Sequence, residues 1–123
     1  MKNKENILKT KRHKEGILHL AMNDPKSKNS LSKQMMDSLM NTIETAYTDD
    51  SVKVIIIAAT GNVFCAGHDL KEMTEARKTK KQGEPYFRDL FDQCSALMEL
   101  IVNCPKPVIA EVSGIATAAG CQL

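Results

Sequence analysis

The order of apolar and polar residues along the 123-residue chain predicts alternating strands and helices. Residues 16–24, GILHLAMND, alternate apolar with small or polar side chains and stop at Asn-Asp-Pro, which is typical of a strand closed by a turn. Over residues 31–47, apolar side chains recur at every fourth position from Leu31 to Tyr47. This spacing predicts a helix with one face packed on a sheet.

The second half of the chain continues the alternation. Residues 52–61, VKVIIIAATG, form an unbroken run rich in Val and Ile, which predicts a central strand covered on both faces. A second helix is predicted from about Pro85, where proline suits the first turn. The prolines on either side of Lys106 lead into a short third strand at 107–114, and IATAAGCQL at 115–123 then predicts the start of a helix of small residues. The fold class is therefore α/β, with a narrow sheet of three strands.

Composition and charge limit the range of functions that the chain could have. Aromatic residues make up 4% of the chain and Trp is absent, so stacking platforms for bases are few. The net charge of +2 is too small to argue for a nucleic-acid partner, and none is expected. Basic residues nevertheless gather in two clusters, Lys2, Lys4, Lys9, Lys11, Arg12 and Lys14 near the N-terminus and Arg77, Lys78, Lys80 and Lys81 further on. These clusters are interpreted as solvated surface, with attraction for a phosphate-bearing ligand, or more weakly nucleic-acid binding, as alternatives.

Domain organisation and compartment follow from the same features. We expect residues 1–15 to be a basic, flexible N-terminus and residues 16–123 to form a single domain. The longest apolar run, residues 54–59, is far below the ~20 residues that span a bilayer, so no membrane association is expected. No apolar signal core is present either, which favours the cytoplasm, with mitochondria as the less favoured alternative. The four cysteines, Cys65, Cys94, Cys104 and Cys121, show no metal-ligand spacing, so no metal site is predicted.

The stretch VFCAGHDLKEM, residues 63–73, carries candidate chemistry. Its small residues follow a strand and let a ligand approach the main chain near Gly67 and His68. Asp69 stands where a helix N-cap would, and Glu72 three residues later completes an acidic version of the capping box. Free N–H donors at such a helix start favour negative charge.

A second glycine-bordered bend occurs in GIATAAGCQL, residues 114–123. If the two bends lie at neighbouring strand ends, each can aim one N–H at the same oxygen, which is the geometry of an oxyanion hole. Spacing alone favours a simpler explanation, in which the small residues only allow a helix to pack closely on a strand.

Three segments, DPKSKNSLS, VFCAGHDLKEM and PKPVIAEVSGIATAAGCQL, resemble the N-terminal signatures of the crotonase (enoyl-CoA hydratase/isomerase) superfamily in their usual order and spacing. The resemblance begins at about Ile17 and is greatest to the enoyl-CoA hydratase domain-containing members with GHDLKE and ATAAGCQL. It implies a spiral of ββα units, of which residues 16–123 are the N-terminal part, with the C-terminal half absent. Full-length members are expected to form homotrimers, and the missing half supplies much of the trimer surface.

The resemblance also implies a substrate and a mechanism. An acyl-CoA thioester would bind with its carbonyl oxygen held by the backbone N–H groups of His68 and Ala119, which stabilise an enolate without a metal or a separate cofactor. His68 would act through its main chain. Lys26 and Lys28 are candidates to meet CoA phosphates, with solvated lysines as the alternative. The other substrate-binding candidates border the two bends: Ala66, Gly67, Asp69 and Gly120.

One departure from the family pattern concerns the acid-base residues. Gln122 stands where hydratases carry a glutamate, and an amide cannot exchange a proton at pH 7. The second acid-base residue of the family lies downstream of the last residue of this chain. Two interpretations therefore stay open: a fragment of an enoyl-CoA hydratase/isomerase-like lyase of fatty acid metabolism, or a catalytically inactive member that acts as a binding or partner module.

Overall fold

The structure is a computed structural model and describes residues 6–79 and 83–123. Its elements are, in chain order, β1 (Leu8–Arg12), β2 (Ile17–Met22), the 3-10 helix η1 (Pro25–Ser27), α1 (Lys33–Tyr47), β3 (Val54–Ala59), β4 (Val63–Cys65), α2 (Leu70–Lys78), α3 (Gly83–Val102), β5 (Val108–Ala110), β6 (Ile115–Ala116) and α4 (Ala119–Gln122). The α/β class predicted from the sequence is confirmed.

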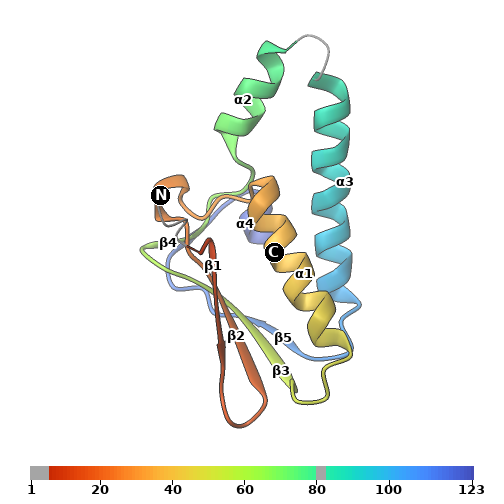
Figure 1. Ribbon diagram of the computed structural model, residues 1–123. Helices are drawn as coiled ribbons and strands as arrows, with labels where there is room; N and C mark the ends of the chain where they lie inside the picture. Colours follow the sequence, from red (N-terminus) through yellow and green to blue (C-terminus); the bar gives the residue numbers. More distant parts are fainter. Residues whose placement is uncertain (1–5, 80–82) are drawn as a thin grey trace, which may run out of the picture.

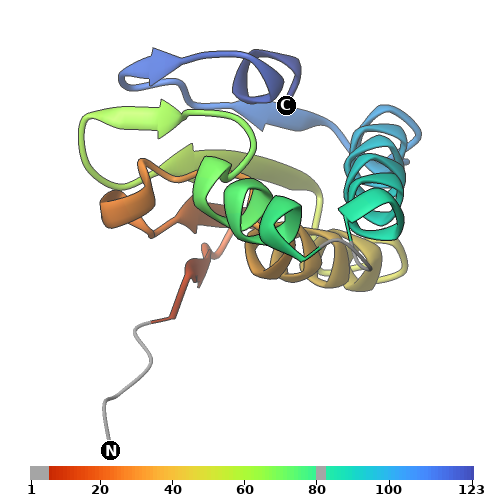
Figure 2. The same cartoon turned by 90° about the horizontal axis from the view of Figure 1, so that it is seen from above.

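The strands form two sheets. The main sheet has the order β1-β2-β3-β5, in which β1 and β2 are antiparallel and β2, β3 and β5 are parallel. β3 therefore lies inside the sheet, as its unbroken apolar sequence predicts. The second sheet consists of β4 and β6, paired in parallel. Figure 2 shows β4 alongside the C-terminal segment that holds β6 and α4.

The core lies between the main sheet and two helices, α1 and α3, which run side by side in Figure 1. α1 begins after Ser32, whose hydroxyl accepts a hydrogen bond from the N–H of Met35 at 3.1 Å and so caps the helix. The predicted apolar stripe of α1 and alternate residues of β2 are buried in this layer, together with side chains of β3 and α3: Leu18, Leu20, Met22, Met35, Met36, Leu39, Ile43, Ile55, Ile57, Leu90 and Leu97.

The N-terminal region differs from its predicted flexibility, because residues 8–12 form the edge strand β1. Leu8 is buried and lies opposite Met22, so one apolar contact and an antiparallel ladder hold the segment on the sheet. Gly16 closes the hairpin with φ +84°, a conformation that glycine adopts without strain. Four lysines of the predicted basic clusters, Lys2, Lys4, Lys80 and Lys81, lie outside the described residues.

The C-terminal segment also differs from its prediction. Residues 115 and 116 do not start a helix but form β6, which pairs with Val63 and Cys65 of β4, and helical structure begins only at Ala119. The conformation at Ala118, with φ +50°, breaks any continuous helix from residue 115. Within the described part of the chain, no helix combines the length and the apolar character that crossing a membrane would require.

Candidate functional site

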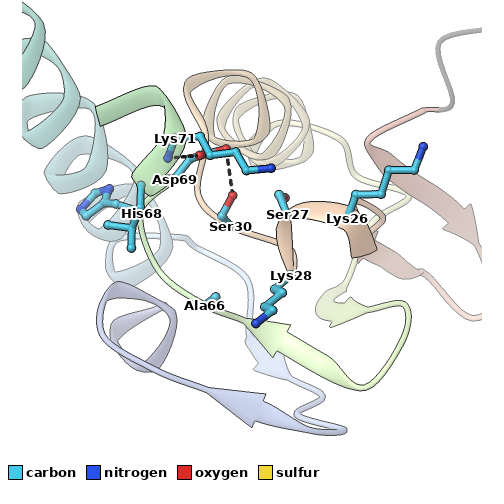
Figure 3. A pocket seen from close by; sticks show the side chains of 9 residues that line it. Lys26, Ser27, Lys28, Ser30, Ala66, His68, Asp69 and Lys71 are labelled. Atoms are coloured by element: carbon cyan, nitrogen blue, oxygen red, sulfur yellow. Dashed lines mark hydrogen bonds between the residues drawn. The ribbon is translucent and has the colours of Figure 1, made fainter. Parts of the chain in front are cut away.

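Two segments that lie far apart in the sequence enclose a pocket of about 320 Å³ (Figure 3). One is the turn at η1, and the other runs from the end of β4 into the start of α2. The lining residues are Lys26, Ser27, Lys28, Ser30, Ala66, His68, Asp69, Leu70 and Lys71. Five of the residues predicted for the site lie together in this pocket: Lys26, Lys28, Ala66, His68 and Asp69. The sequence analysis did not identify the other four, Ser27, Ser30, Leu70 and Lys71.

The η1 turn is held by Asn29, a fully buried residue in the left-handed conformation with φ +51°. Its side-chain oxygen accepts a hydrogen bond from the N–H of Asp24 at 2.7 Å. Its Nδ2 donates to the carbonyl oxygens of Thr60 at 2.9 Å and Val63 at 2.8 Å. Asn29 thereby ties the lysine-bearing turn to the connection between β3 and β4. In the sequence, the preference of Asn for left-handed turns indicates a turn at this position. The sequence does not reveal which backbone groups its side chain binds.

Backbone hydrogen bonds join the two walls of the pocket. The N–H of Ala66 donates to the carbonyl of Lys28 at 3.2 Å, and the N–H of Leu31 donates to the carbonyl of Gly67 at 2.7 Å. Leu31 and His68 also form an isolated parallel bridge. The main chain around His68 is therefore held at a defined position beside the η1 turn.

The capping role predicted for Asp69 is confirmed. Its Oδ1 accepts hydrogen bonds from the N–H groups of Lys71 at 2.9 Å and Glu72 at 3.2 Å, and Oδ2 accepts from the hydroxyl of Ser30 at 3.3 Å. The side chain of Glu72 has a different partner from the one a capping box requires. It accepts from the N–H of Lys33, at the start of α1, at 3.2 Å.

The charge of the pocket is positive overall. Three lysines, Lys26, Lys28 and Lys71, line it with a single carboxylate, Asp69, whose oxygens are engaged with backbone and hydroxyl donors. Figure 3 shows Lys71 reaching from α2 toward Ser27, above the turn that carries the other two lysines. Such a group of ammonium ions beside a helix start favours an anionic ligand.

The imidazole of His68 turns away from these lysines, toward α3 (Figure 3). It meets the ring of Phe91 edge to face, with 5.5 Å between centroids. Its Nδ1 is buried and has no hydrogen-bond partner among the residues that the structure describes. Removal from water lowers the pKa of His68 below its usual value, because burial penalises the charged ring. The side chain of His68 therefore packs on α3 and not on the lysine-bearing turn.

The two glycine-bordered bends lie against each other. Gly67 has φ +90°, and a Cβ added there would stand 3.1 Å from Cβ of Ala118 and 3.3 Å from N of Ala119. A Cβ on Gly120 would come within 2.2 Å of the carbonyl oxygen of Cys65. The close packing considered from the sequence is thus present, and the bend at Gly67 lies against the Ala119 amide.

The amide N–H groups of His68 and Ala119 donate no hydrogen bond to a backbone acceptor within residues 6–79 and 83–123. Since the bend at Gly67 touches Ala119, the two unused donors belong to adjoining stretches of main chain. This arrangement suits an oxygen that carries negative charge.

Gln122 lies apart from the lysine pocket. It lines a different cavity, of about 470 Å³, together with Cys94, Ser95, Met98 and Glu99 of α3. The cysteines are free thiols, and burial raises the pKa of Cys65 and of Cys94. Across the described residues, no group of three or more His, Cys, Asp or Glu side chains is arranged to hold a metal ion.

Comparison with known proteins gives relatives that are longer than this chain. Enoyl-CoA hydratase domain-containing protein 3, mitochondrial, from Mus musculus is 45% identical over 116 residues, which cover 94% of this chain and 37% of the relative. The 2,3-dehydroadipyl-CoA hydratase of Escherichia coli (strain K12) is 36% identical over 107 residues, or 87% of this chain and 39% of that protein. The chain thus spans well under half the length of the curated relatives it matches.

The expected cytoplasmic location is wrong. Similar proteins from mouse, rat, frog, human and zebrafish, 45–47% identical to this chain, are all named as mitochondrial, which points to mitochondria rather than the cytoplasm. The physical reason for the error is that neither the composition nor the apolar pattern of this chain distinguishes a cytosolic from a mitochondrial protein.

Solved structures show the same fold. The crystal structure of human enoyl-CoA hydratase domain-containing protein 3 superposes with a TM-score of 0.86 at 43% identity, covering 96% of this chain and 44% of that one. An enoyl-CoA hydratase from Mycobacterium smegmatis gives 0.88 at 43% identity, covering 97% and 44%. The family model described as enoyl-CoA hydratase/isomerase matches residues 12–123. The chain, by sequence and by fold, belongs to the enoyl-CoA hydratase/isomerase family.

Proposed function

We propose that this chain binds an acyl-CoA thioester and holds its carbonyl oxygen between the N–H groups of His68 and Ala119. Hydrogen bonds from two fixed amides strengthen as negative charge develops on that oxygen, so they stabilise an enolate more than the resting thioester. In other oxyanion holes, the loss of one donor costs about 3–4 kcal/mol of transition-state stabilisation. No metal or separate cofactor is needed for this step.

The observation that carries the proposal is the contact between the two bends. N of Ala119 would lie 3.3 Å from a Cβ at Gly67, so a side chain at residue 67 would crowd the approach to this amide. Glycine leaves the space open, and the donors on either side of it are unused by the described residues. A carbonyl oxygen is of the right size and charge to accept from both.

The lysine pocket supports a CoA ligand in particular. CoA carries several phosphate charges, and Lys26, Lys28 and Lys71 supply ammonium groups to a pocket that His68 also lines. The alternative for Lys26 and Lys28 was that their side chains are simply solvated. Because the two lysines lie in one pocket with a third, Lys71, binding of a phosphate is favoured over that alternative. The mitochondrial relatives support a mitochondrial location.

The experiment that tests this function compares two ligands that differ only at the proposed oxygen. Acetyl-CoA has the thioester carbonyl, whereas S-ethyl-CoA has a methylene in its place. We call the ratio of their dissociation constants, S-ethyl-CoA over acetyl-CoA, the carbonyl preference. Calorimetry on the folded chain is expected to give a carbonyl preference of about tenfold, equivalent to about 1.4 kcal/mol. Equal affinities for the two ligands would contradict the proposal.

Replacing Ala119 by proline removes one of the two donors, and proline is tolerated at the first residue of a helix. The carbonyl preference should then fall toward one, while the affinity for S-ethyl-CoA stays the same. That second affinity is the internal control for folding and for binding of the CoA portion.

A second candidate function is a catalytically inactive member of the family that binds an acyl-CoA or a protein partner. Gln122 favours it, because this side chain cannot act as acid or base. This function predicts a carbonyl preference without hydration of crotonyl-CoA, even when the C-terminal part of a full-length relative is supplied. Hydration that disappears in Ala119→Pro would exclude it in favour of the enzyme.

A further inference from the structure

The position of α2 depends little on apolar packing. None of its residues is fully buried, and Met73 provides a partly buried contact with the core. Leu70, its first residue, is 73% exposed. In Figure 1, α2 lies beside the far end of α3, away from the main sheet. Polar contacts must therefore contribute much of what places α2.

One carboxylate oxygen supplies such contacts. Oε2 of Glu72 accepts a hydrogen bond from the N–H of Lys33 at 3.2 Å and from the hydroxyl of Tyr86 at 3.3 Å. Lys33 is the first residue of α1, where backbone N–H groups lack partners within the helix. Tyr86 belongs to α3, so three helices meet at this single oxygen.

The two partners of Glu72 are themselves fixed to each other. The ammonium group of Lys33 lies 4.6 Å from the ring centroid of Tyr86. Gln93 of α3 donates to the carbonyl of Lys33 at 3.2 Å and to Oδ1 of Asp37 at 2.6 Å. α1 and α3 are therefore held together by contacts that do not involve Glu72. The hydrogen bonds of Glu72 attach α2 to this pair of helices.

Tyr86 is suited to remain a donor in this contact. Burial raises its pKa, and the neighbouring carboxylate of Glu72 raises it further because a phenolate beside it would be repelled. The hydroxyl thus keeps its proton at all pH values near neutrality.

Asp69 connects Glu72 to the candidate oxyanion hole. Asp69 binds the N–H of Glu72 itself at 3.2 Å, and its neighbour in the chain is His68. On the other side, Leu31 holds the carbonyl of Gly67. The peptide that carries the His68 N–H is therefore held between the η1 side and the first turn of α2.

We propose that Glu72 is a positioning residue for the oxyanion hole, which holds the first turn of α2 on α1 and α3 so that the His68 amide keeps its direction. This inference rests on the proposed function, since it concerns the same amide. It predicts that loosening α2 weakens recognition of the carbonyl oxygen and leaves recognition of the CoA portion as it was.

The test measures the carbonyl preference of the full 123-residue chain in four variants. Glu72→Ala removes the shared acceptor and should reduce the preference at least threefold, with the S-ethyl-CoA affinity unchanged. Glu72→Gln keeps an acceptor oxygen and should retain the preference. Tyr86→Phe removes one of the two donors and should give an intermediate value, which also serves if Glu72→Ala fails to fold. Glu75→Ala is the matched control, because Glu75 lies on α2 and pairs with Lys78 on an exposed face.

Amide hydrogen exchange at Leu31 is followed in the same samples without ligand. Faster exchange in Glu72→Ala but not in Glu75→Ala would show that the contact with Gly67 has loosened. A carbonyl preference in Glu72→Ala equal to that of the original chain would overturn the positioning role, whatever the exchange rate. A preference of one in the original chain would instead overturn the proposed function itself, and with it this inference.

Discussion

Asn29 and Val63 are joined by a hydrogen bond of 2.8 Å from Nδ2 of Asn29 to the carbonyl oxygen of Val63, which links the lysine-bearing turn to the start of β4. The same amide also donates to Thr60. This buried side chain therefore acts together with the backbone hydrogen bonds of Ala66 and Leu31 to hold the η1 turn against the other wall of the pocket.

Replacing Asn29 by alanine should lower the free energy of unfolding by about 2–4 kcal/mol, because two partly buried carbonyl oxygens lose their donor and alanine adopts the left-handed conformation poorly. Urea titration of the variant checks this value. Asn41→Ala, at an exposed position on α1, is the control and should change the stability by less than about 0.5 kcal/mol. Equal stabilities of the two variants would show that Asn29 does not hold the turn.

The partners of Asn29 also illustrate what the sequence could and could not reveal. β2, α1 and β3 were predictable, since each is long enough for its apolar period to be read. The bonds of Asn29 join residues 31 and 34 positions apart, and no local pattern encodes such a pairing. Strands of two or three residues, such as β4 and β6, likewise have no readable period, so residues 115 and 116 were assigned to a helix.

Parts of the candidate site were predictable from the sequence, namely those in which the residue type restricts the local backbone conformation. Asp69 was identified as a cap because carboxylates favour helix starts, and the bends were identified by their glycines. Lys71 and Ser30 line the pocket only because the chain folds back on itself, so their types carried no signal. Gln122 lines a cavity against α3 and not the lysine pocket, and its residue type gave no indication of which side of α4 it would occupy.

Gly120→Ala should be strongly destabilising. The new Cβ would stand 2.2 Å from the carbonyl oxygen of Cys65, so α4 must move away from β4 and take the amide of Ala119 with it. We expect a loss of about 2–4 kcal/mol in urea unfolding and a carbonyl preference close to one.

Gly83→Ala is the matched control for this change. A Cβ on Gly83 would be 3.7 Å from its nearest neighbour, the carbonyl of Ala76, which is an ordinary contact. Alanine also favours a helix over glycine, so the stability of this variant should be equal or higher. If Gly120→Ala behaved in the same way, the two bends would not be in the close contact described above.

Lys106 is expected to stabilise the C-terminal end of α1. Its ammonium group donates to the carbonyl oxygen of Ala46, in the last turn of that helix, and to that of Asp49, just beyond its end. Lys106→Met keeps the length of the side chain and removes the donors, and it should lower the midpoint of thermal unfolding, with a loss of about 1–2 kcal/mol. Lys78→Met removes an exposed lysine paired with Glu75 and should cost less than about 0.5 kcal/mol. An unchanged midpoint in Lys106→Met would exclude the capping role.

His68 should make the folded chain less stable as the pH falls below neutrality. Burial lowers its pKa in the folded state, so between that pKa and the usual value near 6.5 the unfolded chain binds a proton that the folded chain does not. Unfolding is therefore favoured by acid in this window, and stability should rise with pH until about 6.5. The pKa of Asp49 is lowered from 3.8, first by hydrogen bonds from Ser51, so its carboxyl is ionised in both the folded and the unfolded chain near neutrality and does not contribute there.

The measurement for His68 is the difference between the urea midpoints at pH 7.5 and pH 5.5. His68→Gln keeps a polar side chain that does not titrate, so this difference should become smaller than in the original chain. The backbone N–H at residue 68 is retained, and the carbonyl preference at pH 7.5 should therefore stay within about twofold of the original value, a change below about 0.5 kcal/mol. A carbonyl preference lost in His68→Gln would mean that the imidazole, rather than the main chain, contacts the thioester.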